Sequence, residues 1–262
     1  MKPVLRWLGL VLLALLALQL FFVARIAAMA VLDPESTAFQ RSDAWTQVTS
    51  TGTLRWRQQW VPYAQISDHL KRAVIASEDD SFVNHDGVDW NAIEKAWERN
   101  AQAEERAARQ QAKADAAAAA GSTAARQRVQ AASARPVKAP KVRGGSTITQ
   151  QLAKNLLLSG ERTLLRKGQE FALTLLLEQL LTKQRILEIY LNNVEWGNGV
   201  FGAEAAAQHY FGKSASRLSP AEAARLAVML PAPKRFETLA NSAYLAGRTR
   251  VIVGRMRSAQ LP

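Results

Sequence analysis

Glu78 has the clearest potential for chemistry in this sequence, because it is the first of three consecutive acids that directly follow an apolar segment. The apolar residues 70–76 predict the end of a buried helix, so the Glu78 carboxylate is expected where the chain leaves the core. Partial burial raises the pKa of a carboxylate, as a general acid or base working near neutral pH requires. Phe82 is expected to pack into the core and His85 to lie in a tight polar loop. A solvated acidic loop is the alternative that these residues leave open.

A second group of polar residues follows two glycines, Gly144 and Gly145. Thr147, followed three residues later by Gln150, is a typical helix start. On the helix that follows, Gln150, Gln151 and Lys154 fall on adjoining positions of one face. A glycine turn before a polar helix start with a lysine one turn later suits a phosphate-bearing ligand. The order of residues differs from that of a nucleotide P-loop, and an ordinary surface helix is the alternative.

Glu170 is the third candidate, because it follows Arg166 and Lys167 at helical spacing and precedes an apolar run. A plain ion pair with Arg166 or Lys167 within one helix would explain the same pattern.

The composition excludes several classes of site. The 262 residues include no cysteine, which excludes disulfides, thiolate zinc sites and thiol nucleophiles. The formal net charge of +12 favours anionic partners: nucleic acid, phospholipid head groups or a phosphorylated substrate.

The N-terminal segment predicts a membrane anchor. Lys2 and Arg6 precede an almost uninterrupted apolar run over residues 7–24. About eighteen residues at roughly 1.5 Å each span about 27 Å, close to the thickness of a bilayer's hydrocarbon core. The positive residues place the N-terminus in the cytoplasm and the chain after residue 31 outside it, which argues against nucleic acid as a partner. A cleaved signal peptide is the alternative, since Ala28-Met29-Ala30 resembles a processing site.

The remaining sequence divides into a stalk, a largely helical domain and an insertion. With residues 1–32 as the cytoplasmic N-terminus and anchor, residues 33–65 read as a membrane-proximal stalk with a short strand near residues 53–60. Trp45, Trp56 and Trp60 are expected in the core, with a belt at the bilayer surface as the alternative.

Residues 66–262 form the main domain, with helices predicted over 66–77, 161–193, 203–210 and 241–256 and a capped helix starting at Ser219. In the segment 161–193 a helical period is sustained by Leu164, Phe171, Leu175, Leu180, Ile186 and Leu187. Its solvent side is expected to carry Arg166, Lys167, Lys183 and Arg185.

Residues 98–142 differ in composition and are interpreted as a basic Ala/Arg-rich insertion, helical up to residue 120. A solvated spacer and a basic arm that touches anionic lipids are both compatible with this segment.

Taken together, these motifs resemble those of the peptidoglycan glycosyltransferases. The segments that carry the resemblance are Glu78-Asp79-Asp80-Ser81-Phe82-Val83-Asn84-His85-Asp86-Gly87, Arg143-Gly144-Gly145-Ser146-Thr147-Ile148-Thr149-Gln150-Gln151-Leu152-Ala153-Lys154-Asn155, Arg166-Lys167-Gly168-Gln169-Glu170, Lys183 to Asn192 and Gly199 to Phe211. Five ordered motifs make the resemblance specific. The sequence lacks a penicillin-binding domain, so it resembles the monofunctional biosynthetic peptidoglycan transglycosylases. Its insertion is longer than the family pattern leads one to expect.

The resemblance implies a mostly α, lysozyme-like glycosyltransferase domain that polymerises lipid II into β-1,4-linked glycan strands. By this resemblance Glu78 is the general base, and Lys154 and Arg162 stabilise the departing diphosphate. Glu170 is expected to hold those cations or to help bind a divalent metal, Mg²⁺ or Mn²⁺, with no metal obligatory. The other residues expected to contact or support the substrate are Ser146, Thr147, Gln150, Gln151, Asn155, Asp79, Phe82 and His85.

The expected setting is the bacterial cytoplasmic (inner) membrane, with the catalytic domain on the periplasmic side. Expected partners are lipid II and the nascent glycan chain, the membrane with its anionic lipids, and cell-division or elongation proteins; nucleic acid is not expected. A lytic transglycosylase or muramidase is an alternative, although a hydrolase has no diphosphate to neutralise. A membrane-anchored scaffold that binds lipid II is the other alternative.

Overall fold

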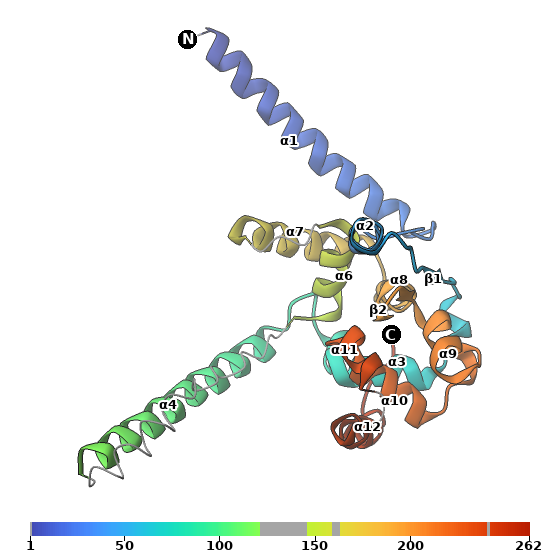
Figure 1. The fold of residues 1–262 in the computed structure, drawn as a ribbon. Helices are drawn as coiled ribbons and strands as arrows, with labels where there is room; N and C mark the ends of the chain where they lie inside the picture. Colours follow the sequence, from blue (N-terminus) through green and yellow to red (C-terminus); the bar gives the residue numbers. More distant parts are fainter. Residues whose placement is uncertain (1, 121–145, 159–162, 240–241) are drawn as a thin grey trace. The chain divides into compact units, whose positions relative to one another are not determined.

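The computed structural model describes residues 2–120, 146–158, 163–239 and 242–262 (Figure 1). Over these residues the chain is predominantly helical, which confirms the predicted mostly α class. Its contacts divide it into two units. One comprises Met1–Val88 and Ser146–Pro262, and the other comprises Asp89–Gly145. The candidate site lies in the first unit.

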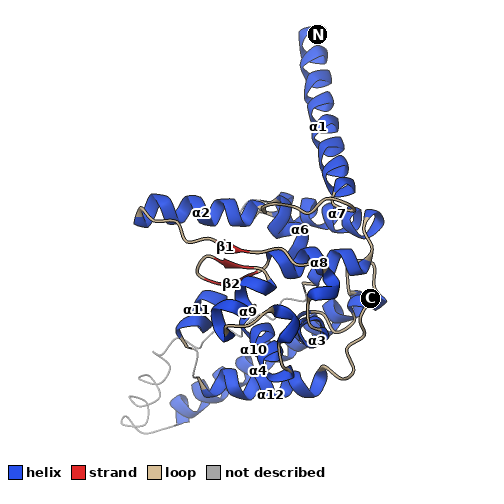
Figure 2. Ribbon diagram, turned by 90° about the vertical axis from the view of Figure 1, so that its right-hand side faces the viewer, coloured by secondary structure: helices blue, strands red, loops and turns tan. Residues whose placement is uncertain are grey.

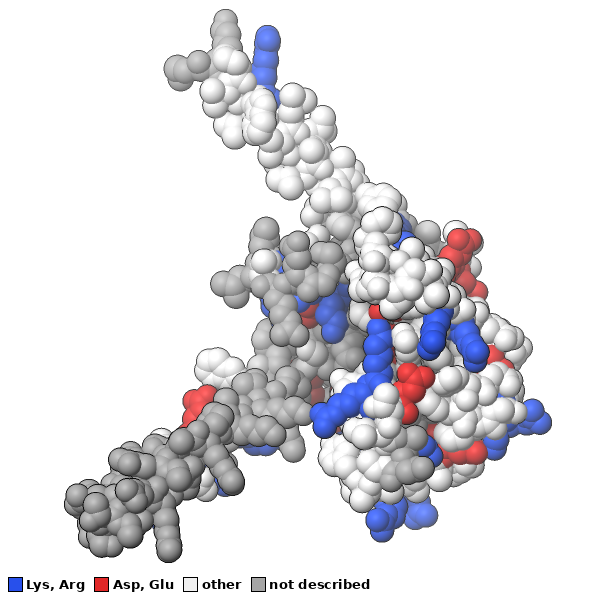
Figure 3. Space-filling model, in the orientation of Figure 1, with Lys and Arg blue, Asp and Glu red and all other residues white. Residues whose placement is uncertain are grey.

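Helix α1 (Lys2–Ala28) is the predicted anchor, and its apolar side chains are exposed over most of its length. It is the one helix among the described residues that is long and apolar enough to cross a membrane. Its surface carries little charge (Figure 3). Towards its C-terminal end, however, Phe22 and Ile26 are buried with Met29 in the core of the first unit. The anchor is therefore packed onto the domain that it carries.

Helix α2 (Ala38–Thr51) lies within residues 33–65, where the sequence predicted short strands and no helix, and that expectation was wrong. Thr37 and Gln40 form a capping box at its start, and Gly52 ends it in the left-handed conformation with φ 68°. The strand expected after it is reduced to β1 (Arg57–Gln58). The sequence does not mark this helix because its few large hydrophobic residues, Phe39, Trp45 and Val48, are exposed and its one buried residue is the polar Gln40, so no apolar period appears.

The three tryptophans of this region have different surroundings. Trp45 on α2 is 72% exposed, so the prediction that it packs in the core was wrong. Trp56 packs against Phe201 with 5.2 Å between ring centroids, and Trp60 is partly buried against the core. The core prediction therefore holds for two of the three.

Helix α3 (Asp68–Glu78) confirms the predicted helix that leads to the acids. A short 3₁₀ turn (Tyr63–Gln65) precedes it and another (Phe82–Asn84) follows it. The Ser67 side chain caps its start, and its last residue is Glu78. The helix packs against α10 (Pro220–Met229), so its apolar face is buried while its C-terminal end reaches the surface of the core.

Three helices surround the second group of motifs: α6 (Ile148–Leu157), α7 (Leu164–Leu180) and α8 (Lys183–Asn193). Helix α6 packs against α2, α7 and α8. The expected orientation is confirmed for Ile186 and Leu187, which are buried, and for Lys167, whose side chain is 57% exposed. It was wrong for other residues of α7 and of the start of α8. Phe171, Leu175 and Leu180 are exposed, whereas the side chains of Lys183 and Arg185 are only 19% and 14% exposed. Helix α7 instead buries Glu170, Leu173, Thr174 and Leu177.

A small sheet lies beside these helices in the order β1-β3-β2 (Figure 2). Strand β3 (Val200–Phe201) pairs in parallel with β1 and antiparallel with β2 (Glu195–Gly197). Gly199 in the connecting turn has φ 70°, and a Cβ there would lie 2.2 Å from the Arg55 carbonyl oxygen. Glycine is required at this position because the two backbones touch.

The C-terminal part consists of α9 (Ala203–Phe211), a 3₁₀ turn (Ala215–Arg217), α10, α11 (Pro233–Thr238) and α12 (Ala243–Arg255). The predicted capping box of α10 is confirmed, with Ser219 and Glu222 bonded reciprocally. Helices α3 and α12 both pack on α10, and the three helices together form the part of the core next to the acids 78–80.

The second unit contains α4 (Trp90–Ala120), which confirms the predicted helix in the first part of the insertion. This helix carries five Lys/Arg and five Asp/Glu residues. The positive excess of the insertion therefore comes from residues 121–142, which lie outside the described residues.

Candidate active site

Glu78 lies at the C-terminal end of α3, half-buried, with its carboxylate directed at the second group of motifs. Gln151 Nε2 donates to Glu78 Oε2 at 3.1 Å, and Ser77 Oγ donates to Glu78 Oε1 at 3.3 Å. Burial raises the pKa of Glu78, and the Asp79 charge raises it further, while the two hydrogen bonds oppose this shift. The upward shift of the Glu78 pKa is the one that the apolar segment before this residue predicts.

Asp79 joins the first group of acids to the start of α6. It is 7% exposed; its Oδ2 accepts from the Ile148 backbone N–H at 3.0 Å and its Oδ1 from His85 Nε2 at 2.9 Å. A carboxylate at the first N–H group of a helix also interacts favourably with the helix dipole. Asp79 and His85 therefore hold the two motifs together. Phe82 is fully buried, as predicted, and the Lys183 ammonium lies 4.5 Å from its ring centre.

The start of α6 is built by Thr147 and Gln150. Thr147 Oγ1 accepts from the Gln150 N–H and donates to the Gly87 carbonyl at 2.6 Å. Gln150 Oε1 accepts from the Thr147 N–H at 3.2 Å. Both residues are buried, and their hydrogen bonds support the start of α6; their contact with substrate stays a prediction. Ser146, just before them, is exposed.

Farther along α6, three predicted site residues are accessible. Gln151 is half-buried against Glu78, Lys154 is exposed one turn later and Asn155 is partly exposed. Since residues three or four apart share a helix face, Lys154 and Asn155 follow Gln151 along the face that meets Glu78. Arg162 lies outside the described residues.

Glu170 is 4% exposed on α7, and Lys167 Nζ forms an ion pair with its Oε1. The ion pair within one helix that the sequence allowed is thus confirmed. The described residues contain no group of three or more His, Cys, Asp or Glu that could hold a metal ion. Glu170 offers one carboxylate that a lysine already neutralises, which does not fit a preformed site for Mg²⁺ or Mn²⁺.

Two residues that the sequence did not single out belong to this region. Tyr190 on α8 is 1% exposed, and its hydroxyl donates to Gln151 Oε1 at 3.0 Å. Glu178 on α7 accepts from Thr149 Oγ1 and from Lys183 Nζ at 2.9 Å. Tyr190 lies within the Lys183 to Asn192 motif that carries the family resemblance, but between buried apolar neighbours it is indistinguishable in the sequence from a tyrosine that only packs in the core.

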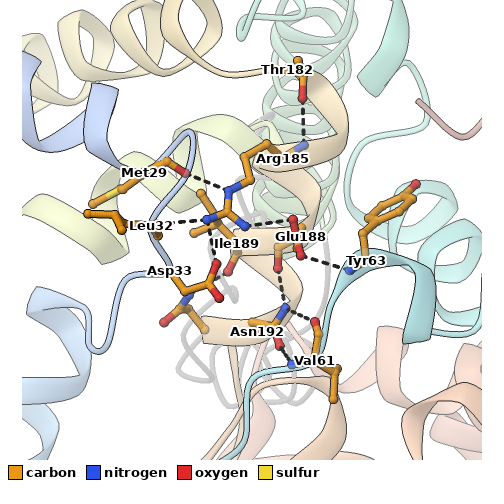
Figure 4. Close-up of polar contacts among 11 residues, drawn as sticks. Met29, Leu32, Asp33, Val61, Tyr63, Thr182, Arg185, Glu188, Ile189 and Asn192 are labelled. Carbon is orange, nitrogen blue, oxygen red and sulfur yellow. Dashed lines mark hydrogen bonds and ion pairs between the residues drawn. The ribbon is translucent and has the colours of Figure 1, made fainter.

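Helix α8 is fixed from two sides (Figure 4). Arg185 donates to the carbonyl oxygens of Met29 at 2.7 Å and Leu32 at 2.9 Å, just after the end of α1. Asn192 exchanges two hydrogen bonds with the Val61 backbone, at 2.9 and 3.0 Å. The helix that carries Tyr190 is therefore attached to the end of the anchor and to the segment before α3.

The site therefore combines an acid of raised pKa, a neutral amide that orients it, and an exposed lysine on the same helix as the amide. Such an arrangement can take a proton from a hydroxyl group and stabilise negative charge nearby.

Comparison with known proteins places this arrangement in a family. The transglycosylase family model matches residues 46–135 and 123–257. A biosynthetic peptidoglycan transglycosylase of Paraburkholderia xenovorans is 48% identical over 98% of this chain and 94% of that protein. The proteins of that name from Burkholderia thailandensis and Herminiimonas arsenicoxydans are 51% and 46% identical, over 95% and 100% of this chain and 84% and 99% of their own lengths. The resemblance seen in the sequence is thus confirmed: this chain belongs to the transglycosylase family and is a glycosyltransferase.

Proposed function

We propose that this chain is a peptidoglycan glycosyltransferase that polymerises lipid II into β-1,4-linked glycan strands and releases undecaprenyl diphosphate. Its match to the transglycosylase family and its relatives, which are named biosynthetic peptidoglycan transglycosylases, support this assignment. The observation that carries it is the Glu78 carboxylate, whose pKa burial raises and which an amide from the neighbouring motif orients.

Glu78 acts as the general base. Its carboxylate removes the proton from the 4-hydroxyl of the acceptor sugar as that oxygen attacks the anomeric carbon of the lipid-linked donor. The new glycosidic bond forms as the bond to the diphosphate breaks, and the electron pair leaves with the diphosphate. Direct attack inverts the configuration at the anomeric carbon.

Lys154 stabilises the departing diphosphate, because this exposed residue follows by one helical turn the residue that contacts Glu78. Asn155 and Ser146, both accessible, are assigned to sugar or phosphate oxygens. Arg162 keeps the same assignment from the family resemblance. Glu170 keeps its lysine neighbour in place, and no metal ion is assigned a step.

The proposed location is the outer face of the cytoplasmic membrane. Helix α1 has the length and composition to span it, and Lys2 and Arg6 favour a cytoplasmic N-terminus. Helix α7, which contacts α1, exposes Phe171 and Leu175 one turn apart. An exposed apolar stripe next to an anchor suits the bilayer surface, so the substrate reaches the site by diffusion within the membrane.

Replacing Glu78 by Gln tests the proposal. Glu78→Gln keeps the shape and the contact with Gln151 but removes the base, so polymerisation of labelled lipid II should fall by at least about a hundredfold. The control is Glu105→Gln on α4, whose carboxylate is exposed and pairs only with Arg109 in the described structure. Retained activity in Glu78→Gln would contradict the assignment of the base.

The same assay separates the alternatives. Polymer made from lipid II indicates a synthase, whereas muropeptides released from purified cell-wall sacculi indicate a lytic transglycosylase or muramidase. A scaffold that only binds lipid II would do neither. The Glu78 geometry alone suits both enzyme classes, but the lysine-bearing face of α6 favours a reaction with an anionic leaving group.

A further inference from the structure

A chain of three side chains from three helices leads from the buried part of α8 to the proposed base. The Tyr190 hydroxyl donates to Gln151 Oε1 at 3.0 Å, and Gln151 Nε2 donates to Glu78 Oε2 at 3.1 Å. We propose that Tyr190 is a positioning residue for the reaction: through the Gln151 amide, its hydroxyl keeps a hydrogen-bond donor against the Glu78 carboxylate and so favours the ionised form. The inference rests on the proposed role of Glu78 as the base.

The amide of Gln151 can face Glu78 in two ways, and only one suits an ionised carboxylate. A carboxylate accepts hydrogen bonds and cannot donate them, so the NH₂ end of Gln151 must face it. The carbonyl end then faces Tyr190 and needs a donor, which the hydroxyl supplies. All three groups are satisfied only in this orientation.

A proton on Glu78 Oε1 would leave Oε2 an uncharged and therefore weaker acceptor for the Gln151 amide, and a proton on Oε2 would require the opposite orientation of that amide. In the second case the O–H group would donate to the Gln151 carbonyl, and the NH₂ end would then face Tyr190. The hydroxyl hydrogen of Tyr190 would lose its acceptor in a buried position, which is unfavourable. Tyr190 therefore disfavours the proton-bound state of the base and promotes its return to the ionised state after each transfer.

Tyr190 can supply this donor throughout the working pH range. Burial raises its pKa well above the ordinary value, and the charges of Glu78 and Asp79 raise it further. The side chain is 1% exposed. It sits on a helix that Arg185 and Asn192 hold at both ends (Figure 4), so its position does not depend on its own hydrogen bond.

The other charged groups near Glu78 do not change when Tyr190 is replaced. Asp79 lies next in the chain, with its oxygens bonded to His85 and the Ile148 N–H. Asp80 pairs with Arg255 of α12 at 3.2 Å. On α10 the Ala227 carbonyl accepts from Ser77 Oγ, and this contact involves no charged group. From α6 the charged group is Lys154, one turn beyond Gln151.

The test is the pH profile of Tyr190→Phe. The ring still fills its place, but Gln151 is free to rotate, so the proton affinity of Glu78 should rise. Because activity needs ionised Glu78, the acidic limb of kcat/KM should move to higher pH by about 0.5 to 1 unit. At a pH below the limb the rate should fall about three- to tenfold, and it should recover on the alkaline side.

Tyr210→Phe is the matched control, since it also removes one hydroxyl, which donates to the Trp196 carbonyl at 2.7 Å. Its acidic limb should stay at the wild-type pH even if its melting temperature falls. A uniform loss of rate in Tyr190→Phe, with neither the limb nor the titration of the Glu78 carboxyl group moved, would overturn the proposal and leave Tyr190 a purely structural role. In a Gln151→Leu background, replacing Tyr190 should have no further effect on the limb; a shift that persists there also overturns it.

A direct measurement separates this inference from the proposed function. The infrared band of the protonated Glu78 carboxyl group, identified by its absence in Glu78→Gln, reports the proton affinity of Glu78 without turnover. In the full-length chain in vesicles, this titration should shift to higher pH in Tyr190→Phe. An unchanged titration overturns the inference. A shifted titration with an unmoved kcat/KM limb supports the Tyr190 role and removes Glu78 as the base.

Discussion

At the scale of single residues, the site depends on a carboxylate whose burial disfavours its charged form. Glu78 ends an apolar helix, and burial is the largest cause of its raised pKa. Two neutral donors, from Ser77 and Gln151, reduce this cost and lower the pKa in part, and neither adds a positive charge that would lower it further. A base of raised pKa accepts a proton more readily, so the instability of the ionised acid serves the proposed reaction.

This cost predicts that Glu78→Gln is more stable than wild type at neutral pH. The pKa of Glu78 is higher in the folded than in the unfolded state, so the folded state binds the proton more tightly. Ionised Glu78 therefore destabilises the fold above its folded pKa, and this destabilisation disappears as the pH falls through that value towards the unfolded one. Calorimetry should show a higher melting temperature for Glu78→Gln at pH 7 and convergence in acid. A lower melting temperature at pH 7 would contradict this explanation.

At the scale of elements, one buried acid joins two segments that are far apart in the sequence. Asp79 ends α3 and caps the first N–H group of α6, so the base and the amide that orients it share one support. Arg185 likewise joins two distant segments, because its guanidinium on α8 donates to the carbonyl groups just after α1. The relative positions of the helices are thus fixed by a few charged hydrogen bonds.

Asp79→Asn should damage this support. His85 and the Ile148 N–H both donate to Asp79, and an asparagine offers one acceptor and one donor, so one buried donor loses its partner. The expected loss is about 1–3 kcal/mol, or roughly 2–10 °C in melting temperature for a protein of this size. Activity should fall as well, because α6 carries Gln151. The control is Asp80→Asn, an exposed neighbour that pairs with Arg255. Equal melting temperatures for the two variants would show that the cap is unimportant.

At the scale of the whole molecule, the chain combines an anchor packed onto its domain with a separately packed insertion. The five Lys/Arg of α4 are balanced by five acids, whereas residues 121–142 contain five Lys/Arg and no acid. Attraction to anionic lipid must therefore come from outside α4.

Deletions within the insertion test whether the attraction to anionic lipid comes from residues 121–142 and not from α4. Removing residues 101–120 should leave the effect of anionic lipid on lipid II polymerisation unchanged, because a balanced segment gains little from a negative surface. Removing residues 121–142 should reduce that effect, most clearly at low salt. The rate is measured in vesicles with and without anionic lipid. Loss of the effect on removing residues 101–120 would contradict the prediction.

The amino-acid sequence by itself determined the features that depend on neighbours within a few residues. The apolar length of α1, the capping boxes at Thr147 and Ser219 and the turn after Glu78 follow from local chemistry, and the ordered motifs fixed the family. The capping box at Thr37 is equally local, but no apolar period follows it, so the sequence alone does not mark it as the start of a helix.

The tertiary structure alone decided which side chains meet. Glu78, Gln151 and Tyr190 come from three helices, and their contact depends on how those helices pack. The same holds for the direction of α7, whose apolar residues have two available surroundings, the core and the exposed stripe beside the anchor. Periodicity shows that a helix has an apolar face, but the surface that this face meets is set by contacts between residues distant in the chain.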